Sequence, residues 1–138
     1  MSTLVVGYDG SDCARAALDT AIVVADAFGD DIVVVFSYEV NRLGGEVEDY
    51  ARVLRERAAE VLAHAADQAA AKAVKVSTQI VEANPAQALV DAAAVQQARA
   101  IVVGTRGEHP LKGALVGSVP HRLLQISDVP VLIVPDTA

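Results

Sequence analysis

Residues 101–124, IVVGTRGEHPLKGALVGSVPHRLL, concentrate glycines and basic side chains in a chain that is otherwise acidic and rich in alanine. Glycine has no Cβ, so its backbone N–H can approach phosphate oxygens closely and the residue can adopt positive φ angles. Gly117 and Ser118 precede a helical pattern, and the first N–H groups of a helix attract anions. Arg106 and Lys112 add positive charge. This combination favours a loop that binds phosphate.

The spacing of three glycines defines a motif. Gly104 and Gly107 are separated by two residues, and Gly117 follows after nine more. The spacing differs from the G-x-x-x-x-G-K-[ST] of P-loops and from G-x-G-x-x-G, so neither of those mechanisms applies. The alternative is an ordinary loop whose glycines serve turns and whose Ser118 only caps the next helix. The position of all these features together, after a buried strand and before a helix, favours phosphate binding.

Five short apolar runs predict the strands that would position this loop. They are TLVVGY (3–8), DIVVVFSY (31–38), VKVSTQIV (74–81), AIVVGT (100–105) and PVLIVP (130–135). The second, fourth and fifth runs are apolar at nearly every residue, which is typical of strands covered on both faces. The third run alternates more, so we expect it at an edge of the sheet.

Amphipathic segments between these runs predict four helices, at 11–28, 46–72, 84–97 and from about 118 to before 128. Ser11 is expected to cap the first helix and Gly29 to end it. Asn84 is expected to cap the third, with Pro85 at its first helical position. Strands that alternate with helices, joined by right-handed crossovers, predict an α/β fold: a doubly wound, five-stranded parallel sheet flanked by helices, Rossmann-like in type.

In such sheets, ligands bind beyond the carboxyl ends of the strands, at the point where the strand order reverses. This rule points to Gly7, Tyr8 and Asp9 after the first strand, and to the glycine-rich loop after the fourth. Asp9 is a candidate metal ligand or general base, and the alternative is a carboxylate that only caps a turn. Because no nucleophile, base and orienting group can be matched, we predict no catalytic residue.

The composition predicts one soluble, cytosolic domain over residues 1–138. Hydrophobic residues make up 53% of the chain and aromatic residues 4%, so the core is expected to be aliphatic. The net charge of −7 argues against binding to nucleic acid or to anionic membranes. The apolar runs are too short to span a membrane, and no signal-peptide pattern precedes the first strand. The single cysteine, Cys13, is interpreted as a small buried hydrophobe.

The chain resembles the universal stress protein family over essentially its whole length. Nucleotide-binding members of that family carry G-x2-G-x9-G-[ST], and the three glycines of the motif together with Ser118 match this spacing. LVVGYDGS (4–11) is similar to the family's first strand and acidic turn, and VPVLIVP (129–135) is similar to its last strand. The resemblance implies the variant of the fold found in adenine-nucleotide α-hydrolases.

The resemblance further implies a small cytosolic stress-response protein that binds ATP with Mg²⁺ and forms a homodimer through its C-terminal strand. Asp9 would contact the ribose or the metal, and the backbone of Ser37, at the end of the second strand, would meet the adenine. The phosphates would lie against Gly104, Thr105, Arg106, Gly107, Gly117, Ser118 and Val119. The nucleotide would regulate conformation, dimerisation or partner binding rather than serve as a rapidly consumed substrate.

Glu108, His109 and Pro120 depart from the family's typical pattern. Glu108 would repel a triphosphate unless it points outward or helps to bind Mg²⁺, and Pro120 removes one N–H from the first turn of the last helix. One alternative is therefore a nucleotide-free interaction module of the same fold. Another is a protein that slowly hydrolyses ATP or phosphorylates itself. An ATP pyrophosphatase would need a glycine- and serine-rich loop after the first strand, where YDGSDCA holds a single glycine.

Overall fold

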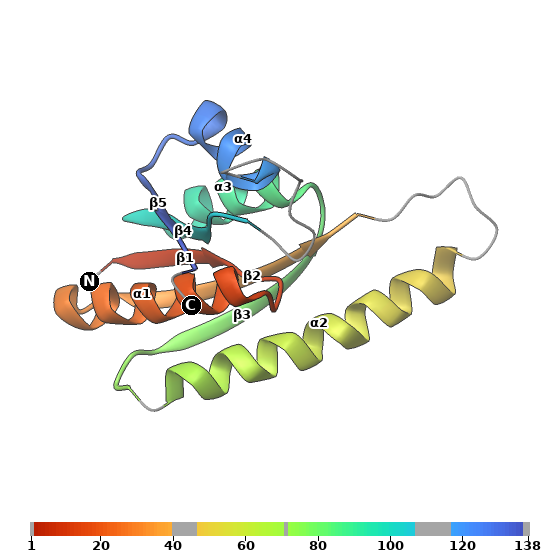
Figure 1. The fold of residues 1–138 in the computed structure, drawn as a ribbon, viewed down its shortest axis with the longest axis horizontal. Helices are drawn as coiled ribbons and strands as arrows, with labels where there is room; N and C mark the ends of the chain where they lie inside the picture. Colours follow the sequence, from red (N-terminus) through yellow and green to blue (C-terminus); the bar gives the residue numbers. More distant parts are fainter. Residues whose placement is uncertain (1, 40–46, 71, 107–116, 137–138) are drawn as a thin grey trace.

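The computed structural model describes residues 2–39, 47–70, 72–106 and 117–136, in which strands and helices alternate (Figure 1). The strands are β1 (Thr3–Gly7), β2 (Asp31–Tyr38), β3 (Val76–Glu82), β4 (Ala100–Gly104) and β5 (Val131–Val134). The helices are α1 (Asp12–Phe28), α2 (Val47–Ala70), α3 (Pro85–Gln96) and α4 (Ser118–Ile126). No helix within the described residues combines the length and the hydropathy that a bilayer span requires.

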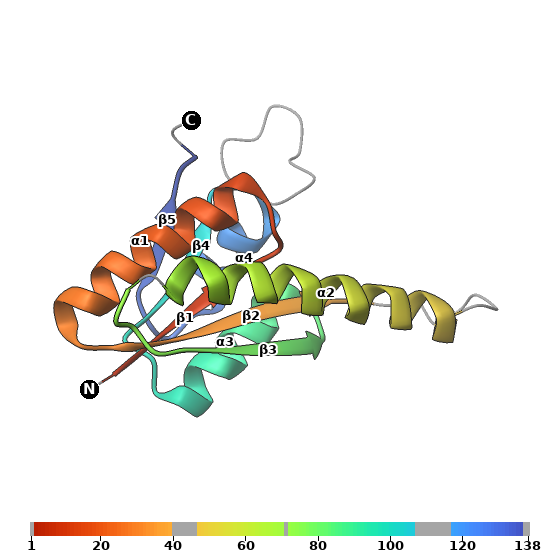
Figure 2. The same cartoon turned by 90° about the horizontal axis from the view of Figure 1, so that it is seen from below.

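The five strands form one parallel sheet in the order β3-β2-β1-β4-β5. The chain builds outward from β1 to β3 and then crosses over to β4, so the strand order reverses between β1 and β4. Helices α1 and α2 lie on one face of the sheet and α3 and α4 on the other (Figures 1 and 2). The predicted doubly wound α/β fold is confirmed, and so is the edge position of the third strand.

The core consists of two layers, one on each face of the sheet. Along β1, Leu4 and Val6 pack toward α1 and α2, whereas Val5 packs toward α3 and α4. The same alternation along β2 sends Val34 to the first layer and Val35 to the second. Helices cover both faces of the central strands, so the side chains on neither face meet water. This explains the uninterrupted apolar sequence of these strands.

The predicted helix ends are largely confirmed. The Ser11 hydroxyl accepts a hydrogen bond from the N–H of Ala14 (3.2 Å), and Gly29 ends α1 in the left-handed conformation (φ 72°). The Asn84 side chain caps α3. The suggestion that Ser118 caps the last helix is wrong: Gly117 is the N-cap residue, no side chain caps the helix, and Ser118 is its first helical residue.

The prediction that residues 130–135 are covered on both faces is wrong for β5. Only Val134 is buried, Val131 and Ile133 are half-buried, and the side chain of Leu132 is 39% exposed. The physical reason is topological, because β5 is the last strand of the sheet and pairs only with β4. Its apolar sequence therefore leaves an open, partly exposed edge.

An ion pair between the buried carboxylate of Asp30 and the partly exposed guanidinium of Arg99 joins strands at their amino ends. The Asp30 carboxylate accepts hydrogen bonds from Arg99 Nε (2.6 Å), from Arg99 Nη2 (3.2 Å) and from the N–H of Ser2 (3.1 Å). The hydrogen bond from Arg99 lowers the pKa of Asp30. These three residues precede β2, β4 and β1, and Arg99 also stacks over the ring of Phe28. The anchor therefore lies at the opposite end of the sheet from the predicted site.

Candidate functional site

A cavity of about 400 Å³ opens at the carboxyl ends of β1, β2 and β4. It includes Gly7, Tyr8 and Asp9 from the end of β1, and Ser37 from the end of β2. The strand order places it across the point where β1 and β4 meet, which is where a doubly wound sheet binds its ligand. Its volume is in the range typical of small-molecule sites.

Both described segments of the glycine motif line the same cavity. Gly104 and Arg106 border it from β4, and Gly117, Ser118 and Val119 border it from the start of α4. Thr105 does not line the cavity; its carbonyl accepts a hydrogen bond from the N–H of Gly117 (2.6 Å). Gly107 lies outside the described residues. The fold thus brings together nearly all the residues that the sequence suggested.

The turn after β1 holds Asp9 at the mouth of the cavity. One carboxylate oxygen of Asp9 accepts a hydrogen bond from the N–H of Ser11 (2.9 Å), which is the geometry of an Asx turn. Gly10 has φ 84° and packs against Val61 of α2, and Arg15 Nη1 donates to the Gly10 carbonyl (2.7 Å). The turn-capping role considered for Asp9 is therefore confirmed, and the turn leaves its carboxylate on the cavity wall.

Tyr8 contributes to the cavity differently from its neighbours. Its side chain is buried in the core layer beneath α1 and α2, on the other face of the sheet. Burial raises the pKa of its phenol, so Tyr8 stays neutral at physiological pH. Its N–H donates to the carbonyl of Val35 (3.0 Å), which holds the end of β1 against β2. Tyr8 therefore has a structural role, and it also lines the cavity, as predicted for a site residue.

Gly104 permits the closest backbone approach near the site. A Cβ at this position would lie 2.6 Å from the Cβ of Cys13 and 2.7 Å from its carbonyl carbon. The first turn of α1 can therefore pack directly on the end of β4 only because residue 104 has no side chain. Cys13 is buried there, as predicted, and its Sγ lies 3.7 Å from Thr105 Oγ1.

The amino end of α4 forms one wall of the cavity and carries the positive end of the helix dipole. The N–H groups of the first helical turn have no acceptor within their own helix, and no side chain caps this helix. Ser118 and Val119 carry such N–H groups at the cavity wall. An anion placed there would receive their hydrogen bonds.

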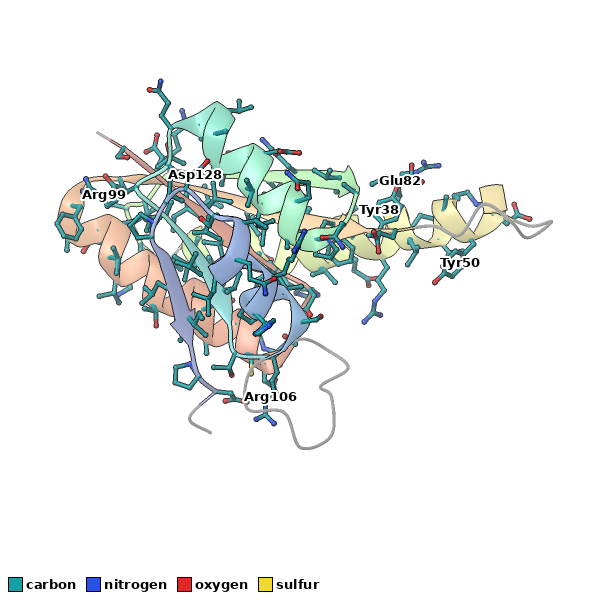
Figure 3. All side chains as sticks on the ribbon, turned by 90° about the horizontal axis from the view of Figure 1, so that it is seen from above. Tyr38, Tyr50, Glu82, Arg99, Arg106 and Asp128 are labelled. Carbon is teal, nitrogen blue, oxygen red and sulfur yellow. The ribbon has the colours of Figure 1, made fainter. Side chains whose placement is uncertain are left out.

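Charged side chains are few on the described cavity wall. Asp9 supplies one carboxylate and Arg106 one guanidinium. Arg106 is exposed, and Figure 3 shows its side chain directed away from the sheet, beyond the opposite end of β4 from Arg99. Within the described ranges, no three His, Cys, Asp or Glu side chains are grouped closely enough to hold a metal ion.

Sequence reasoning missed the apolar wall of the cavity. This wall consists of Ala14, Val35, Pro85, Leu89, Val103 and Pro120. Pro85 and Leu89 are four residues apart and therefore lie on one face of α3. The signal was present in that spacing, but only the tertiary structure shows that α3 packs against β1 and β2 and that Pro85 and Leu89 line the cavity. An aromatic base could pack against such a wall while its phosphate reaches α4.

The chain is similar over nearly its whole length to members of one protein family. The chain matches the model of the universal stress protein family over residues 1–135. It is 31% identical over 136 residues to a universal stress protein of Methanocaldococcus jannaschii, covering 95% of this chain and 80% of the relative. A universal stress protein of Thermus aquaticus is 33% identical, with 96% and 97% covered. A solved universal stress protein in complex with cAMP is 30% identical, with a TM-score of 0.78 and 96% of both chains covered.

Proposed function

The chain belongs to the universal stress protein family, and we propose that it binds an adenine nucleotide in the cavity between β1 and β4. The observation that carries the proposal is the pairing of two unlike walls in one cavity. Pro85, Leu89 and Val35 offer an apolar surface, and the uncapped start of α4 offers backbone donors. A purine packs against an apolar surface, and a phosphate accepts hydrogen bonds from backbone donors.

Within this proposal each part of the nucleotide has a partner. The adenine packs against the apolar wall and meets the backbone of Ser37. The ribose hydroxyls donate to Asp9, whose carboxylate is already oriented by the N–H of Ser11. The phosphates lie at the end of β4 and at the first turn of α4. The relative whose structure was solved with cAMP, at 30% identity, supports an adenine nucleotide as the ligand class.

The nucleotide we propose is ATP with Mg²⁺, acting as a regulator. Titration of MgATP into nucleotide-stripped protein, followed by calorimetry, should give saturable binding of about one nucleotide per chain. The melting temperature should rise in parallel, because a ligand at about a hundred times its Kd stabilises the folded state by about 2.7 kcal/mol. An absence of heat together with an unchanged melting temperature would leave the nucleotide-free interaction module as the better account.

The backbone of Thr105 offers a route by which the nucleotide could affect dimerisation. The N–H of Thr105 donates to the carbonyl of Val134, the last residue of β5 (3.0 Å). The carbonyl of Thr105 accepts a hydrogen bond from the N–H of Gly117 (2.6 Å). A phosphate that adjusts the start of α4 would thus act, through Thr105, on the open edge of the sheet. This contact supports the proposal that the nucleotide tunes pairing of two copies through β5.

Leu132→Lys should weaken self-association at least tenfold, because a charge on an exposed strand edge opposes pairing with a second strand. Sedimentation equilibrium of the wild type and the variant measures this change directly. Leu124→Lys is the matched control, since Leu124 is also an exposed leucine but belongs to α4 and not to β5. MgATP should change the dimerisation constant of the wild type by the same factor by which dimerisation changes the affinity for ATP. Equal association of wild type and Leu132→Lys would exclude β5 as the interface.

A further inference from the structure

The first turn of α4 offers the cavity fewer donors than a helix start normally does. The N–H of Gly117 is occupied by the carbonyl of Thr105 (2.6 Å), and Pro120, the third helical residue, has no N–H. The first two helical residues, Ser118 and Val119, line this end of the cavity and carry N–H groups that have no acceptor within the helix. A phosphate at α4 would therefore meet two backbone donors instead of three.

The described charges of the cavity do not compensate for the missing donor. Among the described residues, the cavity wall carries one carboxylate, that of Asp9, and one guanidinium, that of Arg106, whose exposed side chain is directed away from the sheet. Pro120 itself is buried and presents its ring to the cavity. Negative charge that the two donors do not neutralise would thus have to lose water beside an apolar ring, which is unfavourable.

We propose that Pro120 is a specificity-determining residue, which makes the site prefer an adenine nucleotide whose phosphate at α4 carries a single negative charge. Such a phosphate is esterified on two sides, as the α-phosphate of ATP is. A terminal phosphate carries a charge of about −1.5 to −2 at pH 7 and presents three acceptor oxygens. Two N–H donors satisfy the singly charged, doubly esterified phosphate better than the terminal phosphate. This inference rests on the proposed function and adds the chemical form of the ligand.

Three ligands of increasing charge test the proposal by calorimetry: adenosine, adenosine 5′-(methyl phosphate) and AMP. At about pH 8 the AMP phosphate is fully ionised, because its second pKa is roughly 6. The wild type should bind the methyl ester roughly tenfold more tightly than AMP, which is the effect of about one hydrogen bond to a charged group. Equal or tighter binding of AMP would overturn the proposal, and this comparison requires no variant.

Pro120→Ala restores the third N–H at a position whose φ is already helical. The ratio of AMP affinity to adenosine affinity should rise roughly tenfold in this variant. Pro85→Ala is the matched control, because Pro85 also lines the cavity and begins a helix, but on the wall opposite the proposed phosphate. It should weaken all three ligands by the same factor.

These measurements distinguish failure of the proposed nucleotide binding from failure of the proposed role of Pro120. If neither MgATP nor any of the three ligands binds to the wild type, the proposed function fails and the specificity of Pro120 fails with it. If MgATP binds but the methyl ester binds no more tightly than AMP, only the specificity fails. If AMP binds but its affinity relative to adenosine is the same in wild type and Pro120→Ala, only the role of Pro120 is refuted. Circular dichroism and the melting temperature establish that each variant is folded before it is titrated.

Discussion

Gly117→Asp should weaken ATP binding by roughly a hundredfold or more while leaving the fold intact. Gly117 is the N-cap of α4, with φ −71° and ψ 176°, a conformation that aspartate adopts without strain. Aspartate is a good N-cap residue, and its carboxylate would accept hydrogen bonds from the N–H groups of the first turn. The substitution therefore places a fixed negative charge on the donors that the phosphate needs. Calorimetric titration with MgATP measures the loss.

Gly117→Asn separates charge from size. Asparagine caps helices as well as aspartate does and has nearly the same shape, so both variants should melt within a few degrees of the wild type. The difference between their affinities for ATP measures the electrostatic part of the loss. If folded Gly117→Asp binds ATP as the wild type does, the phosphates do not lie at α4, and this part of the proposed binding mode is wrong.

The second large effect should be on stability: Gly104→Ala is expected to cost about 3 kcal/mol. The added methyl would lie 2.6 Å from the Cβ of Cys13, 2.7 Å from its carbonyl carbon and 2.8 Å from its carbonyl oxygen. Backbone atoms cannot rotate away, so α1 must move off the sheet. Urea denaturation followed by circular dichroism measures the change, which corresponds to a fall in melting temperature of roughly 10 °C.

Gly7→Ala is the matched control for this prediction. Its methyl would lie 3.0 Å from Leu89 Cδ1 and 3.1 Å from Val103 Cγ1, and both are ends of side chains that can shift. The cost should be smaller, about 1 kcal/mol. If Gly104→Ala is no less stable than Gly7→Ala, the close contact between α1 and β4 does not require glycine.

The two glycine predictions assign different reasons to two positions of one motif. Gly104 is required by packing against Cys13, whether or not a ligand is present. Gly117 is expected to matter because it leaves the start of α4 without a side-chain cap. A motif that reads as a single phosphate-binding signal therefore combines a packing requirement with a binding requirement.

The sequence by itself determined the order and type of the elements. Apolar runs separated by caps such as Ser11 and Asn84 are local signals, since they depend on neighbours within one helical turn. The glycine spacing and its place after a strand were likewise visible without the structure, and they led to the family that the comparisons show. Strand β2 (Asp31–Tyr38) was predicted to the residue for this reason.

The tertiary structure decided what depends on strand order. β5 is partly exposed because it is the last strand, although its sequence is as apolar as that of β4. Pro85 and Leu89 line the cavity because α3 packs against β1 and β2, which spacing within α3 cannot reveal. The contact between Gly104 and Cys13 joins residues far apart in the chain. Burial and site geometry depend on contacts between residues that are far apart in the chain. Helix caps and hydrophobic periodicity depend on neighbouring residues, so they can be identified from the sequence.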